Sequence, residues 1–228
     1  MRKLLCFTMI IVLLASGLAA AAELPEDLLA SAASVLKEIA GQPDAEQMHS
    51  VLRSAHGIAI FPSVIKAGLG IGGRYGEGVV LRRDPDTGTW YGPYFVEMKG
   101  LSYGLQIGVQ SISLVLVVNT EEGIKSIQEG RITLGGNISM AAGPVGRSAE
   151  ASTDIQLKAA MYSYSMSKGV FAGASFEGST ISNNSSANRI YWNGDITPRQ
   201  MLNQEAKGDK IQTLLDELNR IIDQVENR

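Results

Sequence analysis

The chain has 228 residues, with 20 Lys or Arg against 23 Asp or Glu, so its formal net charge at pH 7 is −3. This acidic balance disfavours nucleic-acid binding, which requires a basic face. The length and a hydrophobic content of 45% allow one domain with a sizeable core.

The first 22 residues have the pattern of a secretory signal peptide. Arg2 and Lys3 give a positive start, an apolar core covers residues 4–14, and small residues end the segment at Ala22. We expect cleavage near Ala22. The alternative is an uncleaved anchor, although the apolar run is short for a membrane-spanning helix.

Cleavage would change the charge and the redox chemistry of the chain. The 206 residues that remain of 228 keep 18 of the 20 basic side chains and all 23 acidic ones, a net charge of −5. Cys6, the only cysteine, would be lost. Disulfides and thiolate chemistry are therefore excluded from the mature chain.

Two helices are predicted ahead of a glycine-rich region. Apolar residues recur at helical spacing over residues 24–40, where Pro25 suits a first turn and Gly41 ends the helix. A second helix is predicted over residues 44–54, with Asp44 as its candidate N-cap.

Residues 55–83 join an apolar run to a dense series of glycines. Six of the eleven residues from Gly68 to Gly78 are glycine, and residues 68–73 match G-x-G-x-x-G. A dinucleotide site needs a helix that begins inside this motif, whereas β-prone residues follow it here. Glycines also let strands bend sharply or approach another backbone closely. We therefore predict a strongly bent hairpin of residues 69–75 with 77–83, and no cofactor.

The next segment is predicted to be rich in strands. Residues 84–88, Asp-Pro-Asp-Thr-Gly, have the chemistry of a turn. They also resemble the start of a calcium loop, but Phe95 stands where the twelfth-position Glu is required. Further strands are expected over 89–98, 101–110, 113–118 and 131–140, with a short helix from Asn119 or Thr120 to Gly130 and a bend at 135–136.

The last third of the chain is predicted to hold a hairpin and two helices. A strand over 155–167 is expected to turn at Lys168 and Gly169 into a second strand over 170–179. Thr197 is the candidate cap of a short helix. Residues 209–225 carry a clean apolar stripe, which we expect to pack on the domain's own sheet because two heptads are too short for a coiled coil. Pairing with a partner subunit is the alternative.

The sequence contains no recognisable catalytic or metal-binding constellation. His49 and His56 are the only histidines, and no third ligand stands at a fixed spacing from them. A G-x-S-x-G motif and carboxylates placed for acid–base work are missing as well. We therefore expect neither enzymatic activity nor a metal.

Several ordered motifs resemble the SYLF domain family over about residues 50–201. They are A-H-G-I-A-I-F-P at 55–62, K-A-G-L-G-I-G-G-R-Y-G-E-G-V-V at 66–80, T-W-Y-G-P-Y-F at 89–95, G-L-Q-I-G-V-Q at 104–110, A-A-G-P-V-G-R at 141–147 and Y-S-M-S-K-G-V-F-A-G-A-S-F-E-G-S at 164–179. The family includes phosphoinositide- and actin-binding proteins of eukaryotes, and many of its bacterial members are secreted. Their membrane binding is attributed to a basic N-terminal segment, whereas most of the charged residues over 23–54 here are acidic.

The predicted fold is α+β, with a curved, largely antiparallel sheet or barrel-like core and helices at both ends. A signal peptide over 1–22 precedes one domain over 23–228, with a core over about 50–201 and a C-terminal helix over 209–226. The resemblance implies a non-enzymatic, exported lipid- or membrane-binding module of the cell envelope, in the periplasm or at the outer membrane.

Four cations inside the family motifs are the candidate lipid-binding residues: Lys66, Arg74, Arg147 and Lys168. If the bent hairpins meet at one rim, these side chains and free backbone N–H groups can hold a phosphate headgroup. Alternatively, they pair with Glu77, Glu97, Glu150 and Glu177 or stay solvated. The expected partner is a membrane lipid with an anionic headgroup. The second interpretation is a structural or protein-interaction module, a homo-oligomer or the partner of an envelope protein, that uses the C-terminal helix or an exposed sheet face.

Overall fold

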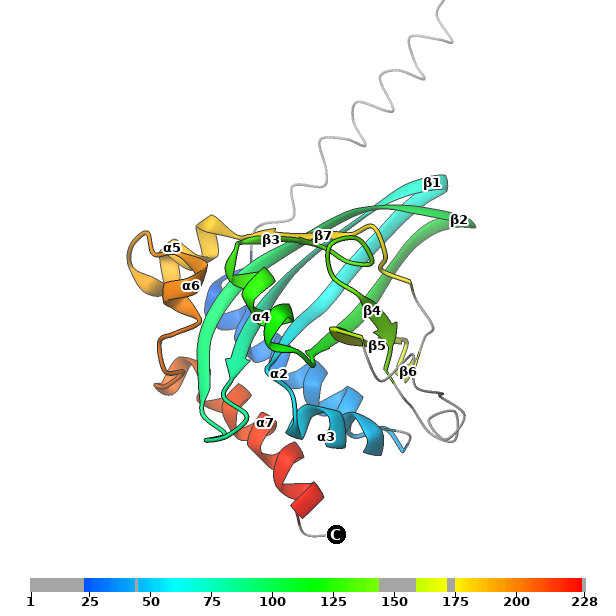
Figure 1. Ribbon diagram of the computed structural model, residues 1–228. Coiled ribbons are helices and arrows are strands. Elements are labelled where there is room, and N and C mark those ends of the chain that lie inside the picture. Colours follow the sequence, from blue (N-terminus) through cyan, green and yellow to red (C-terminus); the bar gives the residue numbers. More distant parts are fainter. Residues whose placement is uncertain (1–22, 44, 144–158, 172–174, 227–228) are drawn as a thin grey trace, which may run out of the picture.

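One strongly curved sheet organises the molecule (Figure 1). The computed structural model describes residues 23–43, 45–143, 159–171 and 175–226. The predicted signal peptide, Asp44 and Arg147 lie outside the described residues. Within them, seven strands follow the order β3-β7-β2-β5-β4, with β1 paired to β2 and β6 paired to β5. All pairs are antiparallel except β4 with β5, which confirms the predicted fold class.

Two strands are far longer than the others. The strands are β1 (Gly57–Arg83), β2 (Trp90–Val118), β3 (Arg131–Thr133), β4 (Met140–Ala142), β5 (Met161–Ser167), β6 (Val170–Phe171) and β7 (Thr180–Asn183). The three strands predicted over 89–118 are therefore one strand. Of the strand predicted over 131–140, only β3 and the first residue of β4 are regular, and Gly135 between them has a positive φ of 70°. In the described part of the strand predicted over 170–179, only Val170–Phe171 is paired as a strand.

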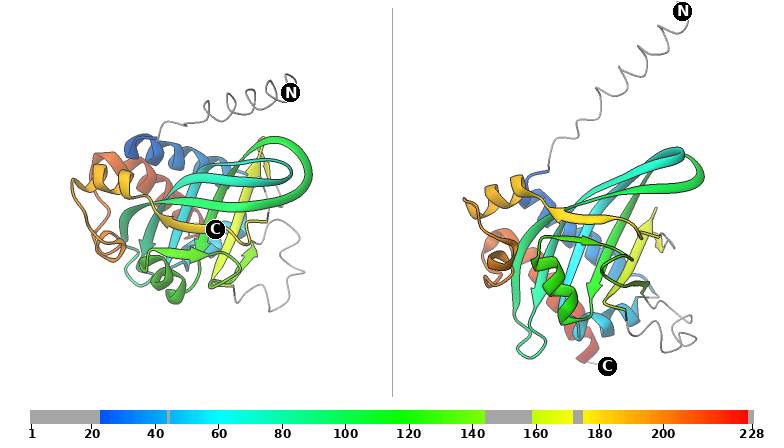
Figure 2. Two further views of the ribbon diagram at one scale, coloured as in Figure 1. Left: turned by 90° about the horizontal axis from the view of Figure 1, so that it is seen from above. Right: turned by 45° about the horizontal axis from the view of Figure 1, so that its top comes forward.

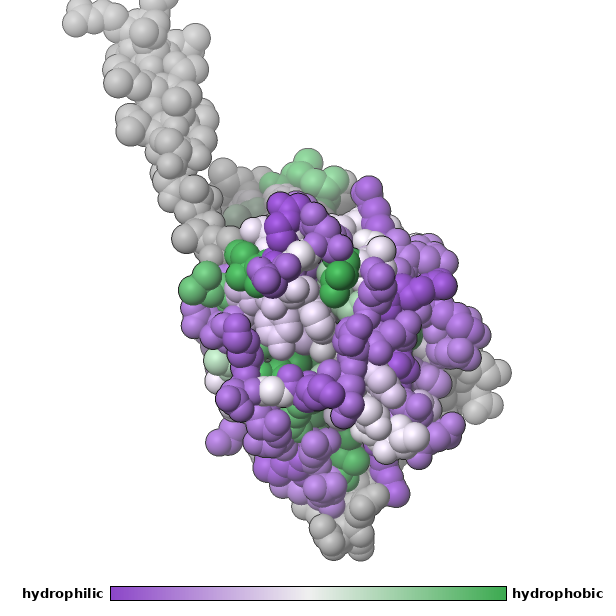
Figure 3. All heavy atoms as spheres, turned by 90° about the vertical axis from the view of Figure 1, so that its left-hand side faces the viewer, coloured by the Kyte–Doolittle hydropathy of each residue, from purple (hydrophilic) through white to green (hydrophobic). Residues whose placement is uncertain are grey.

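The helices flank the sheet at both ends of the chain. They are α2 (Pro25–Ala40), α3 (Glu46–Arg53), α4 (Glu121–Gln128), α5 (Ser185–Trp192), α6 (Pro198–Met201) and α7 (Asp209–Glu226). Thr120 caps α4 by accepting from the Gly123 amide, and Thr197 forms a capping box with Gln200 on α6. The face that carries α5 and α6 is largely hydrophilic (Figure 3). Within the described residues, no helix has both the length and the apolar composition that crossing a bilayer requires.

The glycine-rich stretch bends β1 back on itself. A Cβ atom on Gly68 would lie 2.5 Å from the Gly72 Cα, so the bend falls at residues 68–72. Similar close approaches join Gly76 to Ser63 and Gly78 to Ile60. The halves 57–67 and 72–83 therefore lie side by side, and β2 follows β1 around the bend on its outer side (Figure 2).

The position of this bend corrects the predicted hairpin. Residues 69–75 and 77–83 are not its two arms, because the chain turns at 68–72 and stays extended through Gly76. No helix begins at Gly72, since β1 continues to Arg83. The interpretation of the glycines as a backbone device, rather than a nucleotide loop, is confirmed.

Two buried clusters lie on opposite faces of the sheet. On one face, α2, α3 and α7 cover side chains such as Ile60 and Val117. On the other face, α4, β3 and the end of α6 cover Phe61 and Leu116. The alternation of neighbouring residues between the faces explains why the strands read as continuous apolar runs.

The apolar stripe of α7 belongs to the first cluster. Its buried residues are Ile211, Leu214, Leu215, Leu218, Ile221 and Ile222. They lie against α2 and α3. The stripe is buried within the domain, but the prediction that it packs on the sheet is corrected, because it lies mainly against α2 and α3. The alternative that it is free to pair with a partner subunit is wrong.

Candidate functional site

The bend of β1 and β2 forms one end of the sheet, opposite the turn that joins the two strands. We define the distal end as residues 64–76, 98–112 and 166–171. These segments contain four basic residues, Lys66, Arg74, Lys99 and Lys168, and no Asp or Glu. In a chain with more acidic than basic residues, this is a marked separation of charge.

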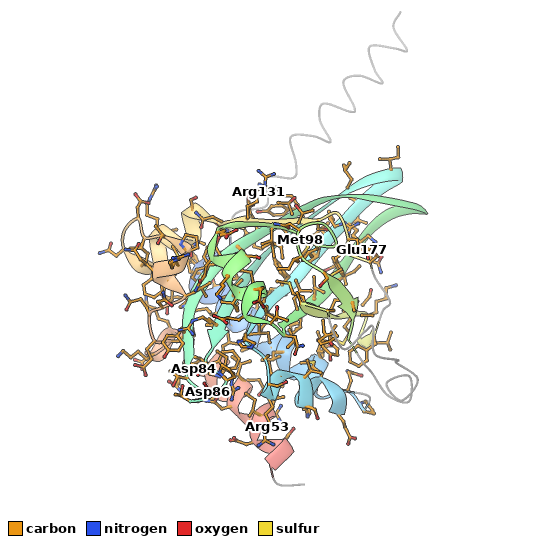
Figure 4. All side chains as sticks on the ribbon, viewed as in Figure 1. Arg53, Asp84, Asp86, Met98, Arg131 and Glu177 are labelled. Atoms are coloured by element: carbon orange, nitrogen blue, oxygen red, sulfur yellow. The ribbon has the colours of Figure 1, made fainter. Side chains whose placement is uncertain are left out.

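The opposite turn is acidic. Asp84 and Asp86 lie there, at the lower end of the hairpin in Figure 4. Asp84 Oδ1 accepts hydrogen bonds from the Thr87 amide at 3.2 Å and the Asp86 amide at 2.9 Å, which lower the pKa of Asp84. Gly88 has a φ of +74° and closes the turn. The turn interpretation of this motif is confirmed.

Arg74 is buried and bonded to the backbone. Its Nη1 donates to the Ser175 carbonyl at 2.8 Å, and its Nη2 donates to the Leu101 carbonyl at 2.9 Å. The guanidinium also lies 5.7 Å from the ring centroid of Phe176. Burial lowers the pKa of Arg74. These contacts give Arg74 a clear structural role, which is to fasten residues 175 and 176 onto the sheet.

Lys66 and Lys168 come together at one rim of the distal end. Lys66 is the register partner of Gln110, whose Nε2 donates to Ser167 Oγ at 3.1 Å. Lys168 follows directly, exposed in the turn between β5 and β6, with a φ of +52°. The side chain of neither lysine pairs with an acidic residue in the part of the chain that the structure describes.

Three of the acidic residues proposed as alternative partners make other contacts, and the fourth, Glu150, lies outside the described residues. Glu97 forms an ion pair of 2.6 Å with Lys99. Glu77 accepts from the Tyr75 hydroxyl at 2.9 Å, and burial together with this bond raises the pKa of Tyr75. Glu177 lies beside Gly135. Among the described residues, Lys66 and Lys168 are therefore the two distal cations without an ion pair, although the Glu38 carboxylate lies near Gly169 in the turn that holds Lys168. Arg74 and Lys99 already have partners.

Several exposed apolar side chains of the distal end are not apparent from the sequence pattern. Exposed fractions are 68% for Ile71, 62% for Leu101, 76% for Val109 and 63% for Val170. Alternation alone does not show which strand ends extend beyond the core. The available signal was the lack of acidic residues over the same segments.

The histidines have structural positions. His49 Nε2 lies 3.0 Å from the Ala40 carbonyl oxygen at the end of α2. His56 joins β1 to β2 through its backbone, whose N–H donates to the Val118 carbonyl at 2.8 Å. The described residues hold no group of three or more His, Cys, Asp or Glu side chains placed to bind a metal ion.

Comparison with known proteins decides the family. The model of the Ysc84 family, described as "Las17-binding protein actin regulator", matches residues 99–221, more than half of the chain. The chain belongs to the Ysc84/SYLF family. The Ysc84 match includes most of β2, every strand and helix from α4 to α6, and α7 as far as residue 221.

The relatives of this Ysc84/SYLF chain include fungal and vertebrate proteins. Protein YSC84 of Saccharomyces cerevisiae is 42% identical over 176 residues, 76% of this chain and 36% of the relative. LAS seventeen-binding protein 3 of the same yeast is 43% identical over 155 residues, 67% of this chain and 33% of the relative. SH3 domain-containing YSC84-like protein 1 of Bos taurus is 36% identical over 177 residues, 75% of this chain and 51% of the relative. The aligned part thus spans a third to a half of these relatives.

Proposed function

We propose that this chain is a non-enzymatic module of the cell envelope that binds anionic membrane lipid, exported to the periplasm or the outer membrane after cleavage near Ala22. One observation carries the proposal. The distal end holds basic residues and no acidic ones, although the whole chain is acidic. Lys66 and Lys168 at its rim are without a described ion-pair partner, so they are free to meet a phosphate headgroup.

Charge determines how the molecule would approach a membrane. Each basic residue near an anionic surface adds about 1 kcal/mol of attraction. At the opposite turn Arg82 and Arg83 balance Asp84 and Asp86, so an approach with the distal end first depends on the positive charge of the distal end itself. The attraction from two or three lysines is modest, so binding is expected to be reversible and sensitive to salt.

Co-sedimentation with vesicles tests this proposal. The chain over residues 23–228 is suitable, because it keeps every helix, strand and core cluster that the structure describes. Vesicles of phosphatidylcholine, with and without phosphatidylglycerol, are compared at about 0.1 M and about 1 M salt, where the Debye length falls from about 10 Å to about 3 Å. We expect binding to the anionic vesicles that weakens at high salt. Absence of binding to either vesicle at low salt would contradict the proposal.

A protein-interaction module is the second candidate. The observation that favours it is that relatives are named for binding Las17, a protein. A partner, whether an envelope protein or a second copy, would use an exposed part of the sheet, because the apolar stripe of α7 is buried. Sedimentation velocity of the same chain without vesicles tests self-association. A monomer that binds anionic vesicles favours the lipid function, and a dimer that does not bind them favours the second candidate.

A further inference from the structure

We propose that the bend of β1 and β2 inserts its apolar side chains into the interface of an anionic bilayer, while Lys66 and Lys168 remain at the depth of the phosphates. This inference rests on the proposed membrane function and adds which part of the molecule enters the membrane. The chemistry of the partner is a lipid surface, with acyl chains for the bend and phosphate groups for the lysines.

Exposed apolar side chains are concentrated at this end. Seven large apolar side chains are exposed in the described part of the molecule, and five of them belong to the distal end. They are Ile71, Tyr75, Leu101, Val109 and Val170. Four of them belong to the β1–β2 hairpin, and Val170 belongs to β6 beside it. Single exposed apolar residues are normal on a soluble protein, but a group of them at one end marks an interaction surface. The hydrophilic face around α5 and α6 is the contrast (Figure 3).

The order of residues along β1 matches the layers of a membrane. Lys66 stands two residues before the bend begins at Gly68 and five residues before Ile71. At about 3.3 Å per residue, Ile71 is at most about 16 Å of strand beyond Lys66, and the bend shortens this distance. Interfacial elements bury their apolar face about 5 to 10 Å below the headgroups. Lysine side chains behind the bend are therefore positioned for the phosphates.

The strands on both sides of the bend are paired, which suits them to a less polar environment. Gly68 lies opposite Gly108 and Ile71 opposite Tyr103, and only the register shift between Leu69 and Ile71 leaves residues 70 and 104–106 without a ladder partner. These ladder bonds already satisfy backbone groups that an open loop would have to remove from water. The charge distribution supplies the attraction that brings the bend to an anionic surface, and it selects a bilayer over a neutral apolar partner.

Site-specific fluorescence tests the inference. The chain over residues 23–228 contains no cysteine, so a single cysteine can carry an environment-sensitive dye. The variants are Val109→Cys and Leu101→Cys at the distal end, and Ile190→Cys on α5, which is 59% exposed and serves as the matched control. On vesicles with phosphatidylglycerol, we expect the dye at 109 and 101 to shift to the blue and brighten about twofold or more, with no change at 190.

A binding measurement separates this inference from the proposed function. We expect Ile71→Ser with Val109→Ser to weaken vesicle binding about tenfold, while Ile190→Ser leaves it unchanged.

If the parent chain binds vesicles but the dye at 109 and 101 does not respond, the bend does not insert and the membrane function stands. The same conclusion follows if the dye at 190 responds equally. If the dye responds to protein concentration without vesicles, the bend is a contact between copies. If the parent chain does not bind vesicles, the proposed function fails and the inference fails with it.

Discussion

The two ends of the β1–β2 hairpin are built from the same strands and have opposite properties. At the proximal end, which we define as residues 57–61, 79–83, 90–96 and 114–118, the strands are buried on both faces, and the charges of Arg82 and Arg83 are balanced by Asp84 and Asp86 in the turn. At the distal end the same strands are rich in glycine, basic and partly exposed. One pair of strands thus supplies both the core of the fold and an element that extends from it.

The comparison separates residues whose packing stabilises the fold from exposed residues that add little to its stability. Val115 belongs to the cluster covered by α2, α3 and α7, and Phe61 belongs to the cluster covered by α4. Because both side chains are closely packed, substituting either one changes the free energy of unfolding. Side chains such as Leu101 and Val109 contact little of the protein, so the fold gains little from them. The proposed membrane contact gives these exposed side chains a role outside the fold.

The largest expected effect compares the same substitution in the core and at the distal end. Leu218→Ala on α7 removes a fully buried side chain and is expected to lower the free energy of unfolding by about 2 to 5 kcal/mol. Leu101→Ala removes a side chain that is 62% exposed and is expected to change it by less than about 0.5 kcal/mol. Urea unfolding of both variants measures the difference. A similar loss in the two would show that the distal end belongs to the core.

Two glycines of β1 provide the next comparison. A Cβ on Gly78 would lie 2.7 Å from the Ile60 carbonyl oxygen, so Gly78→Ala forces the halves of β1 apart and is expected to cost about 1 to 3 kcal/mol. A Cβ on Gly73 meets only the Gly100 carbonyl oxygen, at 4.0 Å. Gly73→Ala is therefore expected to be neutral or to stabilise by up to about 1 kcal/mol. Thermal unfolding followed by circular dichroism separates them, and equal Tm values would contradict the close approach.

Arg74 tests whether its role is structural. Arg74→Lys keeps the charge but cannot make both bonds to the Ser175 and Leu101 carbonyls, so we expect a loss of about 1 to 2 kcal/mol. Vesicle binding per folded molecule should remain close to that of the parent chain. The control is Arg189→Lys. Arg189 pairs with Asp195 on the surface, so this variant should lose little stability. Weaker vesicle binding with unchanged stability would show that Arg74 meets the lipid instead.

Substitution of Tyr94 is expected to have the smallest effect on stability at neutral pH. Burial raises the pKa of Tyr94, and its hydroxyl has no hydrogen-bond partner among the described residues. Tyr94→Phe is therefore expected to leave Tm near pH 8 unchanged or slightly higher. Above a pH of about 10 the unfolded chain loses the tyrosine proton before the folded chain does, so the parent becomes less stable as pH rises. The variant should be the more stable of the two at alkaline pH, and equal alkaline Tm values would contradict this.

The predictable parts of the fold were those with local signals. Helical spacing and capping residues located α2, α6 and α7, and the Asp-Pro-Asp-Thr-Gly turn was confirmed. The bend of β1 was misplaced because its position depends on which glycines face the neighbouring half of the strand, a contact between residues such as Gly78 and Ile60. The merging of three predicted strands into β2 has a similar cause, since pairing with β1 holds Lys99 and Gly100 extended.

The residues of the candidate site could be predicted from the sequence, but their positions in space could not. The family motifs identified Lys66 and Lys168, which the structure brings to one rim, and Arg74, which it buries. The motifs cannot distinguish an arginine that binds backbone carbonyls from one that faces solvent. The exposure of Ile71 and Val109 depends on how far the hairpin extends beyond the helices, which no local pattern encodes.

The most direct test of the division between the two ends is the vesicle affinity of matched charge variants. Lys66→Gln with Lys168→Gln removes two charges from the distal end. Lys207→Gln with Lys210→Gln removes two charges near the start of α7, where Lys207 pairs with Glu205 and Lys210 pairs with Glu26. With phosphatidylglycerol vesicles at low salt, we predict that the first pair weakens binding about tenfold or more, from about 1 kcal/mol per charge, and the second does not weaken it. Equal affinities for the two double variants would contradict the account.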